Sequence, residues 1–139
     1  MEKIVSKRAP DPVGPYPHAR RVGDFIFVSG MGPRQSGTGA IPGVQLDDEG
    51  RIRSHDISVQ TKATIENIRS VLEDAGAKLE DVVDVSVFLT HLKTDFEEFN
   101  RTYGEYFGKI GPTRTTVEVA CLPTPIAVEL KVVAYKPRT

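Results

Sequence analysis

The feature that most constrains the fold is a segment near the end of the chain, residues 126–135, in which apolar side chains alternate with others. Every second position is apolar, at Ile126, Val128, Leu130, Val132 and Ala134. Successive side chains of a β-strand point to opposite faces, so this row predicts a long strand with one face against a core. The other face also carries Val133 and Tyr135. A single chain would leave these two uncovered, so we expect the protein to form an oligomer.

Residues 56–75 predict a helix that packs against this strand. Its apolar residues recur at steps of three, four and three, at Ile65, Ile68, Leu72 and Ala75. Asp56 can cap the amino end, and Gly76 stands where helices commonly stop. The alternation of residues 82–89 then predicts a second strand.

A second helix is expected to begin at Thr94, where the sequence T-D-F-E has the form of a capping box. Aromatic residues then recur at helical spacing and predict its inner face: Phe96, Phe99, Tyr103 and Phe107. Residues 25–29 predict a buried strand, residues 115–120 another strand, and residues 51–54 a short edge strand or a loop. The pattern favours one α+β domain over residues 1–139, with both helices on one sheet face.

Composition excludes several classes of function. With 18 basic and 19 acidic residues, the net charge of -1 argues against a dedicated nucleic-acid binder. No apolar run is long enough to cross a bilayer, and the N-terminal residues lack the pattern of a signal peptide. A single cysteine suits a reducing cytoplasm. The three histidines, His18, His55 and His91, are far apart in sequence and form no common ligand pair, so we expect no metal.

Motifs for nucleotide binding and for nucleophilic catalysis are weak. The glycine-rich residues 37–43 lack the dinucleotide spacing, and Pro42 prevents the helix that would hold a pyrophosphate. Cys121 has no histidine near it in sequence, and Ser29 lacks the frame of a nucleophile elbow. A partly buried thiol and a hydroxyl that bonds to backbone or lines a pocket are the simpler interpretations.

Two charged residues in predicted strands favour another chemistry. Arg114 stands at the start of one strand, and Glu129 lies among apolar residues in the middle of another. Each alone would be interpreted as a solvated or salt-bridged side chain. Together, a guanidinium could bind a substrate carboxylate and a carboxylate could orient or deprotonate a water molecule.

Two separated motifs then resemble the RidA family, also called YjgF/UK114. Residues 112–123, PTRTTVEVACLP, are similar to the C-terminal signature of that family. Residues 14–18, GPYPH, followed by GDFIFVSG at 23–30, resemble its N-terminal block. Within the family, the sequence YPHARR and the long loop at 30–50 look most like 2-aminomuconate deaminases.

The resemblance implies a chorismate-mutase-like α+β fold with a mixed sheet, assembled as a homotrimer with sites between subunits. It implies hydrolysis of enamines or imines of 2-oxo acids to the oxo acid and ammonia, without a metal or organic cofactor. The carboxylate-binding arginine of the family falls on Arg114, its water-positioning glutamate on Glu129 and its pocket tyrosine on Tyr16. Ser29 and Gly30 match residues of the pocket wall.

Three functions remain open on the sequence. The first is a deaminase that converts 2-aminomuconate to 4-oxalocrotonate in the breakdown of aromatic compounds. Its second carboxylate would need a second cation, for which Arg20, Arg21 and Arg34 are candidates. The second is a broad 2-iminobutanoate/2-iminopropanoate deaminase. The third is a non-enzymatic ligand-binding, chaperone-like or RNA-associated protein. The expected partners are a small carboxylate substrate and further copies of the chain, not nucleic acid or membrane.

Overall fold

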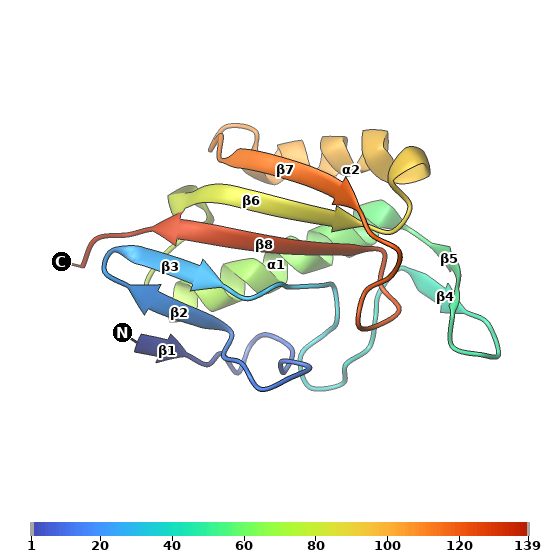
Figure 1. Cartoon of the computed structure of the whole chain (residues 1–139), viewed down its shortest axis with the longest axis horizontal. Helices are drawn as coiled ribbons and strands as arrows, with labels where there is room; N and C mark the ends of the chain where they lie inside the picture. Colours follow the sequence, from blue (N-terminus) through green and yellow to red (C-terminus); the bar gives the residue numbers. More distant parts are fainter. Residues whose placement is uncertain (1, 139) are drawn as a thin grey trace.

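The computed structural model describes residues 2–138 and contains one six-stranded sheet, a separate two-stranded sheet and two long helices (Figure 1). The strands are β1 Glu2–Ile4, β2 Ala19–Val22, β3 Phe25–Val28, β4 Val44–Leu46, β5 Ile52–His55, β6 Val82–Leu89, β7 Thr113–Glu118 and β8 Val128–Tyr135. The helices are α1 Ile57–Asp74 and α2 Leu92–Phe107, with a short 3-10 turn at Leu79–Asp81.

The large sheet is mixed, and β8, the last strand in the chain, lies in its interior. The strand order is β1-β2-β3-β8-β6-β7. All neighbours are antiparallel except β6 and β7, which run parallel because α2 connects them across the sheet. The remaining pair, β4 and β5, forms a small antiparallel sheet of its own before α1.

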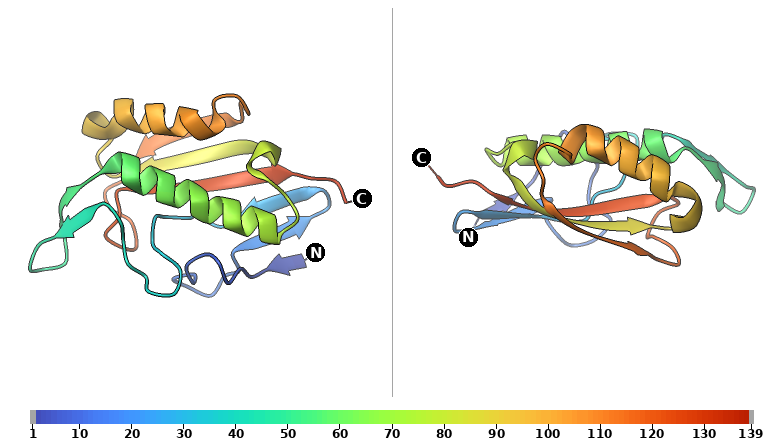
Figure 2. Two further views of the ribbon diagram at one scale, coloured as in Figure 1. Left: turned by 180° about the vertical axis from the view of Figure 1, so that it is seen from behind. Right: turned by 90° about the horizontal axis from the view of Figure 1, so that it is seen from above.

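Both helices lie on one face of the large sheet, as predicted (Figure 2). The core lies between these layers. It contains the row predicted on β8, because Ile126, Val128, Leu130, Val132 and Ala134 are all buried. The helices contribute Ile65, Ile68, Leu72, Phe99 and Phe107, which are also buried. The α+β fold with one helical layer is therefore confirmed.

The opposite face of the sheet is open and partly apolar. Tyr135 is 44% exposed, and Phe25 pairs with it across β3 and β8. Phe27 is 41% exposed on the same strand. The strand predicted at residues 25–29 is present as β3, but the prediction that it is buried holds for one face alone, because only Ile26 and Val28 are buried.

The two helix starts differ in how well the sequence predicts them. Asp56 caps α1 as predicted, since its side chain accepts a hydrogen bond from the Val59 amide. The predicted start at Thr94 is wrong, because α2 begins at Leu92. The Leu92 amide donates to the Glu118 carboxylate at 3.0 Å, so a residue from β7 satisfies the end of the helix.

Other boundaries shift by a few residues. The strand predicted at 115–120 is displaced to Thr113–Glu118, and the last strand begins at Val128. The predicted inner face of α2 is confirmed except for Phe96, which is 42% exposed. Neither α1 nor α2 combines the length and apolarity that crossing a bilayer requires.

The hydrogen bonds at the two helix starts predict different losses in the free energy of unfolding for alanine substitutions at Asp56 and Thr94. Asp56→Ala should lower the free energy of unfolding by about 1 kcal/mol, because the Val59 amide loses its acceptor. Thr94→Ala should change it by less than about 0.5 kcal/mol, because Thr94 is exposed within the first turn and caps no amide. Urea unfolding followed by circular dichroism measures both. Equal losses in the two variants would contradict the assignment.

Candidate functional site

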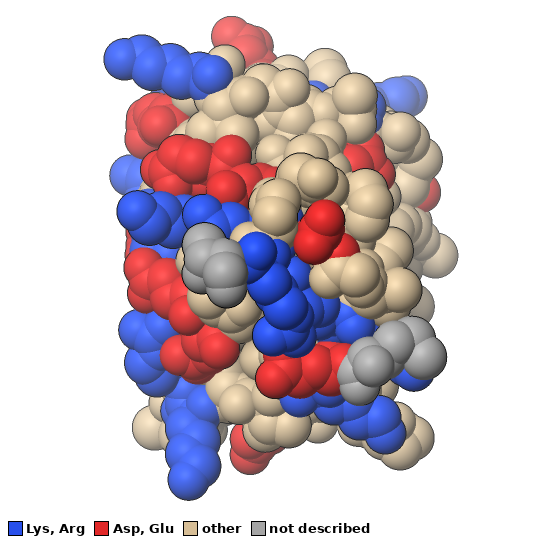
Figure 3. Space-filling model, turned by 90° about the vertical axis from the view of Figure 1, so that its left-hand side faces the viewer, with Lys and Arg blue, Asp and Glu red and all other residues tan. Residues whose placement is uncertain are grey.

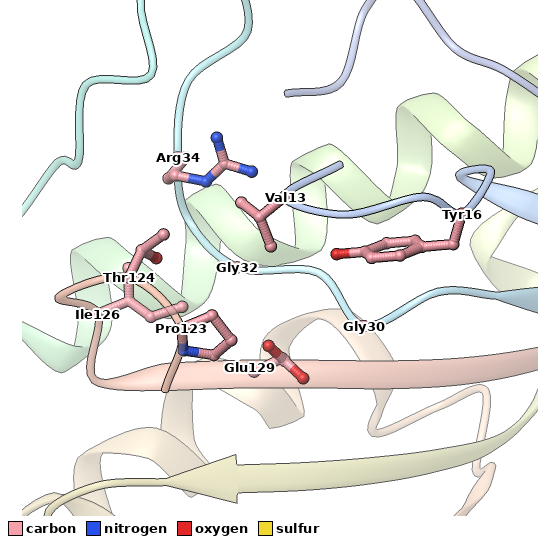
Figure 4. Close-up of a pocket in the computed structure, with 9 residues that line it drawn as sticks. All are labelled: Val13, Tyr16, Gly30, Gly32, Arg34, Pro123, Thr124, Ile126 and Glu129. Atoms are coloured by element: carbon pink, nitrogen blue, oxygen red, sulfur yellow. The ribbon is translucent and has the colours of Figure 1, made fainter. Parts of the chain in front are cut away.

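A cavity of about 160 Å³ opens beside the first residues of β8, where three loop segments meet (Figure 4). The N-terminal loop, the segment after β3 and the loop before β8 form its walls. Its lining residues are Val13, Tyr16, Gly30, Gly32, Arg34, Pro123, Thr124, Ile126 and Glu129. The structure therefore brings three of the predicted site residues, Tyr16, Gly30 and Glu129, into one cavity.

Glu129 supplies the acidic group of this cavity. It lies on the open face of β8 and is half-buried, and its carboxylate points into the space between the loops (Figure 4). Burial raises the pKa of this carboxyl group above its usual value, and the positive charge of Lys131 opposes that rise. No residue among 2–138 donates a hydrogen bond to the Glu129 carboxylate. The group is thus available to a water molecule or a substrate.

Gly30 is required for the close approach of the next segment to Glu129. A Cβ atom at position 30 would lie 2.5 Å from Glu129 Oε2 and 2.9 Å from its Cδ. The segment is fixed beside β8 by two backbone hydrogen bonds between Met31 and Leu130, at 2.8 and 2.9 Å. Any side chain at position 30 would therefore displace the carboxylate.

Ser29 and Tyr16 belong to the same wall but have different contacts. The Ser29 hydroxyl donates to the Pro17 carbonyl at 2.7 Å, and its amide donates to the His18 carbonyl at 2.9 Å. Ser29 thus fastens the N-terminal loop and lines only a smaller neighbouring cavity of about 30 Å³. Tyr16 is carried by that loop, and its hydroxyl points into the main cavity (Figure 4).

Of the three arginines considered for a second carboxylate, only Arg34 lines the cavity. The Asn67 side chain of α1 holds its loop by donating to the carbonyls of Gly32 and Arg34. The Arg34 guanidinium donates to the Asp11 carbonyl at 2.7 Å. Arg21 is buried and bonds to the carbonyls of Gly23 and Lys136, and Arg20 lies at an exposed position of β2.

Sequence reasoning missed the opposite wall of the cavity, formed by Pro123, Thr124 and Ile126. The sequence P-T-P at residues 123–125, between two predicted strands, marks a turn. The sequence thus indicates a turn at these residues, but it does not indicate that the turn borders the cavity.

Arg114 lies apart from this cavity. It pairs with Val85, whereas Glu129 pairs with Phe88 on the same strand β6. Residues 85 and 88 have opposite parity, so the two charged side chains leave opposite faces of the sheet. Arg114 Nη2 donates to Asn100 Oδ1 at 2.7 Å, and its Cζ lies 4.8 Å from the centroid of the Tyr103 ring. The arginine is held against α2, at the edge strand.

Cys121 and the histidines lie outside the cavity that contains Glu129. Cys121 is an exposed free thiol at a second cavity of about 370 Å³, whose lining also includes His91. The expectation that this thiol is partly buried is therefore wrong. The His55 and His91 ring centroids are 4.7 Å apart, although the two histidines are far apart in sequence.

Charges of both signs are mixed on the face of the molecule shown in Figure 3. Lysine and arginine side chains alternate there with aspartate and glutamate, without a continuous basic surface (Figure 3). An extended phosphate backbone is normally bound by such a basic surface. This face therefore gives no support to the RNA-associated interpretation.

Known proteins resemble the chain over nearly its whole length. Residues 6–136 match the family described as Endoribonuclease L-PSP. A RutC family protein of Pyrococcus abyssi is 46% identical over 136 residues, which is 97% of each chain. TdcF of Escherichia coli, named as a candidate reactive intermediate deaminase, is 31% identical over 140 residues, which is 98% of each chain.

Solved structures share the fold. The structure of a candidate endoribonuclease of Thermotoga maritima gives a TM-score of 0.85 at 35% identity, covering 99% of both chains. The structure of E. coli TdcF with bound serine gives 0.84 at 30% identity, covering 98% of this chain and 99% of that one. On this evidence the chain belongs to the Endoribonuclease L-PSP family, which is the RidA/YjgF family.

Proposed function

We propose that the protein is a deaminase that hydrolyses the enamine or imine form of a 2-amino acid derivative to the 2-oxo acid and ammonia. The observation that carries the proposal is the half-buried Glu129 carboxylate, free of hydrogen bonds from residues 2–138, which faces a cavity beside Tyr16 and Arg34. Support also comes from TdcF, which is named as a candidate reactive intermediate deaminase.

The proposed reaction needs a carboxylate anchor and a base that acts on water. An enamine first takes a proton at carbon and becomes the more electrophilic imine. Glu129 then accepts a proton from water as the oxygen adds to the imine carbon, which gives a carbinolamine. Glu129 then gives that proton to the carbinolamine nitrogen, and ammonia leaves as the hydroxyl group loses its proton and becomes the carbonyl group. Holding water and imine together supplies much of the acceleration, and no metal or organic cofactor takes part.

The complete site, in this proposal, contains residues of two chains. Arg114 and Glu129 leave opposite faces of one sheet, so one chain does not place both beside the same small substrate. Arg114 is on the edge strand β7, at the rim where an adjacent copy can reach it. The apolar open face, with Phe27 and Tyr135, favours such a copy. We propose a homotrimer in which Arg114 of one subunit completes the cavity of the next.

The finer proposal concerns the substrate. Arg34 lines the cavity beside Glu129, and its guanidinium can bind a second carboxylate in addition to the one bound by Arg114. A dicarboxylate such as 2-aminomuconate fits two such cations, whereas 2-iminobutanoate would use only one. We therefore propose 2-aminomuconate as the preferred substrate, and the free thiol Cys121 suits the reducing cytoplasm in which this reaction would occur.

The first prediction tests whether two chains share a site. Arg114→Ala and Glu129→Gln should each lower kcat/KM for ammonia release by roughly 100-fold or more. When the two variants are coexpressed, random assembly should restore about a quarter of the wild-type sites, because some interfaces then pair an intact arginine with an intact glutamate.

Ammonia release by the mixed oligomer, compared with the sum of the two separate variants, measures this recovery. Size-exclusion chromatography with light scattering checks that each variant keeps its assembly. Activity of the mixture no higher than that sum would contradict the shared site. Near-normal turnover of Arg114→Ala alone would remove the arginine from the proposed mechanism.

The second prediction concerns pH. Glu129 must be ionised to act as the base, and burial raises its pKa. Activity should therefore fall as the pH is lowered through that raised pKa, at a higher pH than for an ordinary glutamate. The pH profile of kcat/KM, with a no-protein control for spontaneous hydrolysis, measures this. The residual activity of Glu129→Gln should lack this acidic limb. Persistence of the limb in the variant would assign it to another group.

The third prediction concerns Arg34. Arg34→Gln should lower kcat/KM for 2-aminomuconate by roughly tenfold, the size of one charge-assisted contact, and leave 2-iminobutanoate nearly unchanged. Arg20→Gln is the matched control, because Arg20 was an equal candidate on sequence but does not line the cavity. Equal effects of Arg34→Gln on both substrates would contradict the second anchor while leaving the deaminase proposal intact.

A further inference from the structure

A cluster of two histidines and an aspartate lies outside the cavity described above. His55 Nε2 and Asp95 Oδ2 are 2.7 Å apart, and both side chains are about nine-tenths buried, with 11% and 10% exposed. The His91 ring packs against His55 with centroids 4.7 Å apart. One ligand atom from each of the three residues lies within 4.8 Å of the others.

The fold brings these residues together from two distant segments. His55 is the last residue of β5, directly before the cap of α1. His91 and Asp95 belong to the start of α2, one helical turn apart, and the Asp95 amide donates to the His91 carbonyl. His91 is the cap residue before α2 and Asp95 lies in its first turn, and a ligand atom of each lies within 4.8 Å of the other.

One ring nitrogen of His91 already has a hydrogen-bond partner. The Thr90 hydroxyl lies 2.8 Å from His91 Nδ1. In the tautomer that carries its hydrogen on Nδ1, the ring donates to this hydroxyl, and the Nε2 lone pair is left for a metal ion. His55 and Asp95 are likewise turned toward each other rather than toward solvent.

We propose that His55, His91 and Asp95 form a binding site for a divalent transition-metal ion, represented by Zn²⁺. Two imidazoles and one carboxylate are a donor set that zinc uses. Zinc bonds of about 2.0–2.2 Å place tetrahedral donors roughly 3.3–3.6 Å apart. Zinc binding would therefore require His91, which is exposed, to rotate and the His55–Asp95 pair to open.

The site also has an open side. His91 lines the cavity of about 370 Å³ that contains Arg51, Thr90 and Cys121. A fourth ligand, water or a small anion, would enter from this cavity. Because β5 belongs to the small separate sheet, the ion would fasten that sheet to α2. The expected effect is a more stable fold, independent of the deaminase site.

The test is Zn²⁺ binding to the full chain, measured by competition with a chromogenic chelator. We expect one ion per chain with a dissociation constant in the micromolar range or below, and a rise of several degrees in Tm. Mg²⁺ at millimolar concentration should produce neither effect, because it prefers oxygen ligands. His91→Ala should weaken Zn²⁺ binding by at least tenfold and abolish the rise in Tm.

Two control variants distinguish this site from adventitious binding. Lys93→Ala changes an exposed residue of the same helical turn and should bind Zn²⁺ normally. Cys121→Ser should also bind normally, because the thiol is not among the three ligands. Binding that survives in His91→Ala, or that is lost in Cys121→Ser, would overturn the proposal. So would a dissociation constant weaker than about 100 μM for the unchanged chain.

Discussion

The hydrogen-bonded position of β8, between β3 and β6, is the constraint on which the rest of the molecule depends. Its alternation sends Val128, Leu130 and Val132 into the core beneath the helices. The same alternation turns Glu129 to the opposite face, away from the helices. Beneath the helices, a carboxylate would carry a large desolvation cost. One strand thus places both the apolar core residues and the acidic group of the cavity. A shift of its register by one residue would turn Glu129 into the core and the apolar residues to the open face.

The cavity depends on the close approach of the main chain at Gly30 to the Glu129 side chain, which leaves no room for a side chain at position 30. The segment after β3 pairs with β8 through Met31 and Leu130, which leaves Gly30 directly against the Glu129 carboxylate. Ser29 fastens the N-terminal loop to this segment, and Asn67 fastens the part that carries Arg34. The loops that carry the cavity side chains are therefore held by hydrogen bonds from Ser29, directly after β3, and from Asn67 of α1 to main-chain carbonyls.

Regular periodicity made much of the fold predictable. The faces of α1 and β8 follow directly from the spacing of Ile65, Ile68 and Leu72 and from the alternation of residues 126–135, because each is set by residues close in sequence. The start of α2 was not predictable in this way. It depends on Glu118 of β7, which satisfies the Leu92 amide from 26 residues away.

The site shows the same division. Tyr16, Gly30 and Glu129 were predicted by motif and lie together. The choice of Arg34 over Arg20 and Arg21 needed three-dimensional information, because all three are arginines in loop-rich sequence. The proximity of His55 to His91 was also hidden, since 35 intervening residues form α1 and β6 before the chain returns.

The central place of β8 has a consequence for how the chain acquires its structure. Phe27 of β3 pairs with Val133 of β8, so a neighbour in the sheet lies about a hundred residues later in the chain. During synthesis β1, β2 and β3 can form only a small three-stranded piece with an unpaired edge. The free edge of β3 can pair with β8 only after β8 has been synthesised. We therefore expect this protein to fold late and slowly, with its N-terminal strands exposed to wrong partners in the interval.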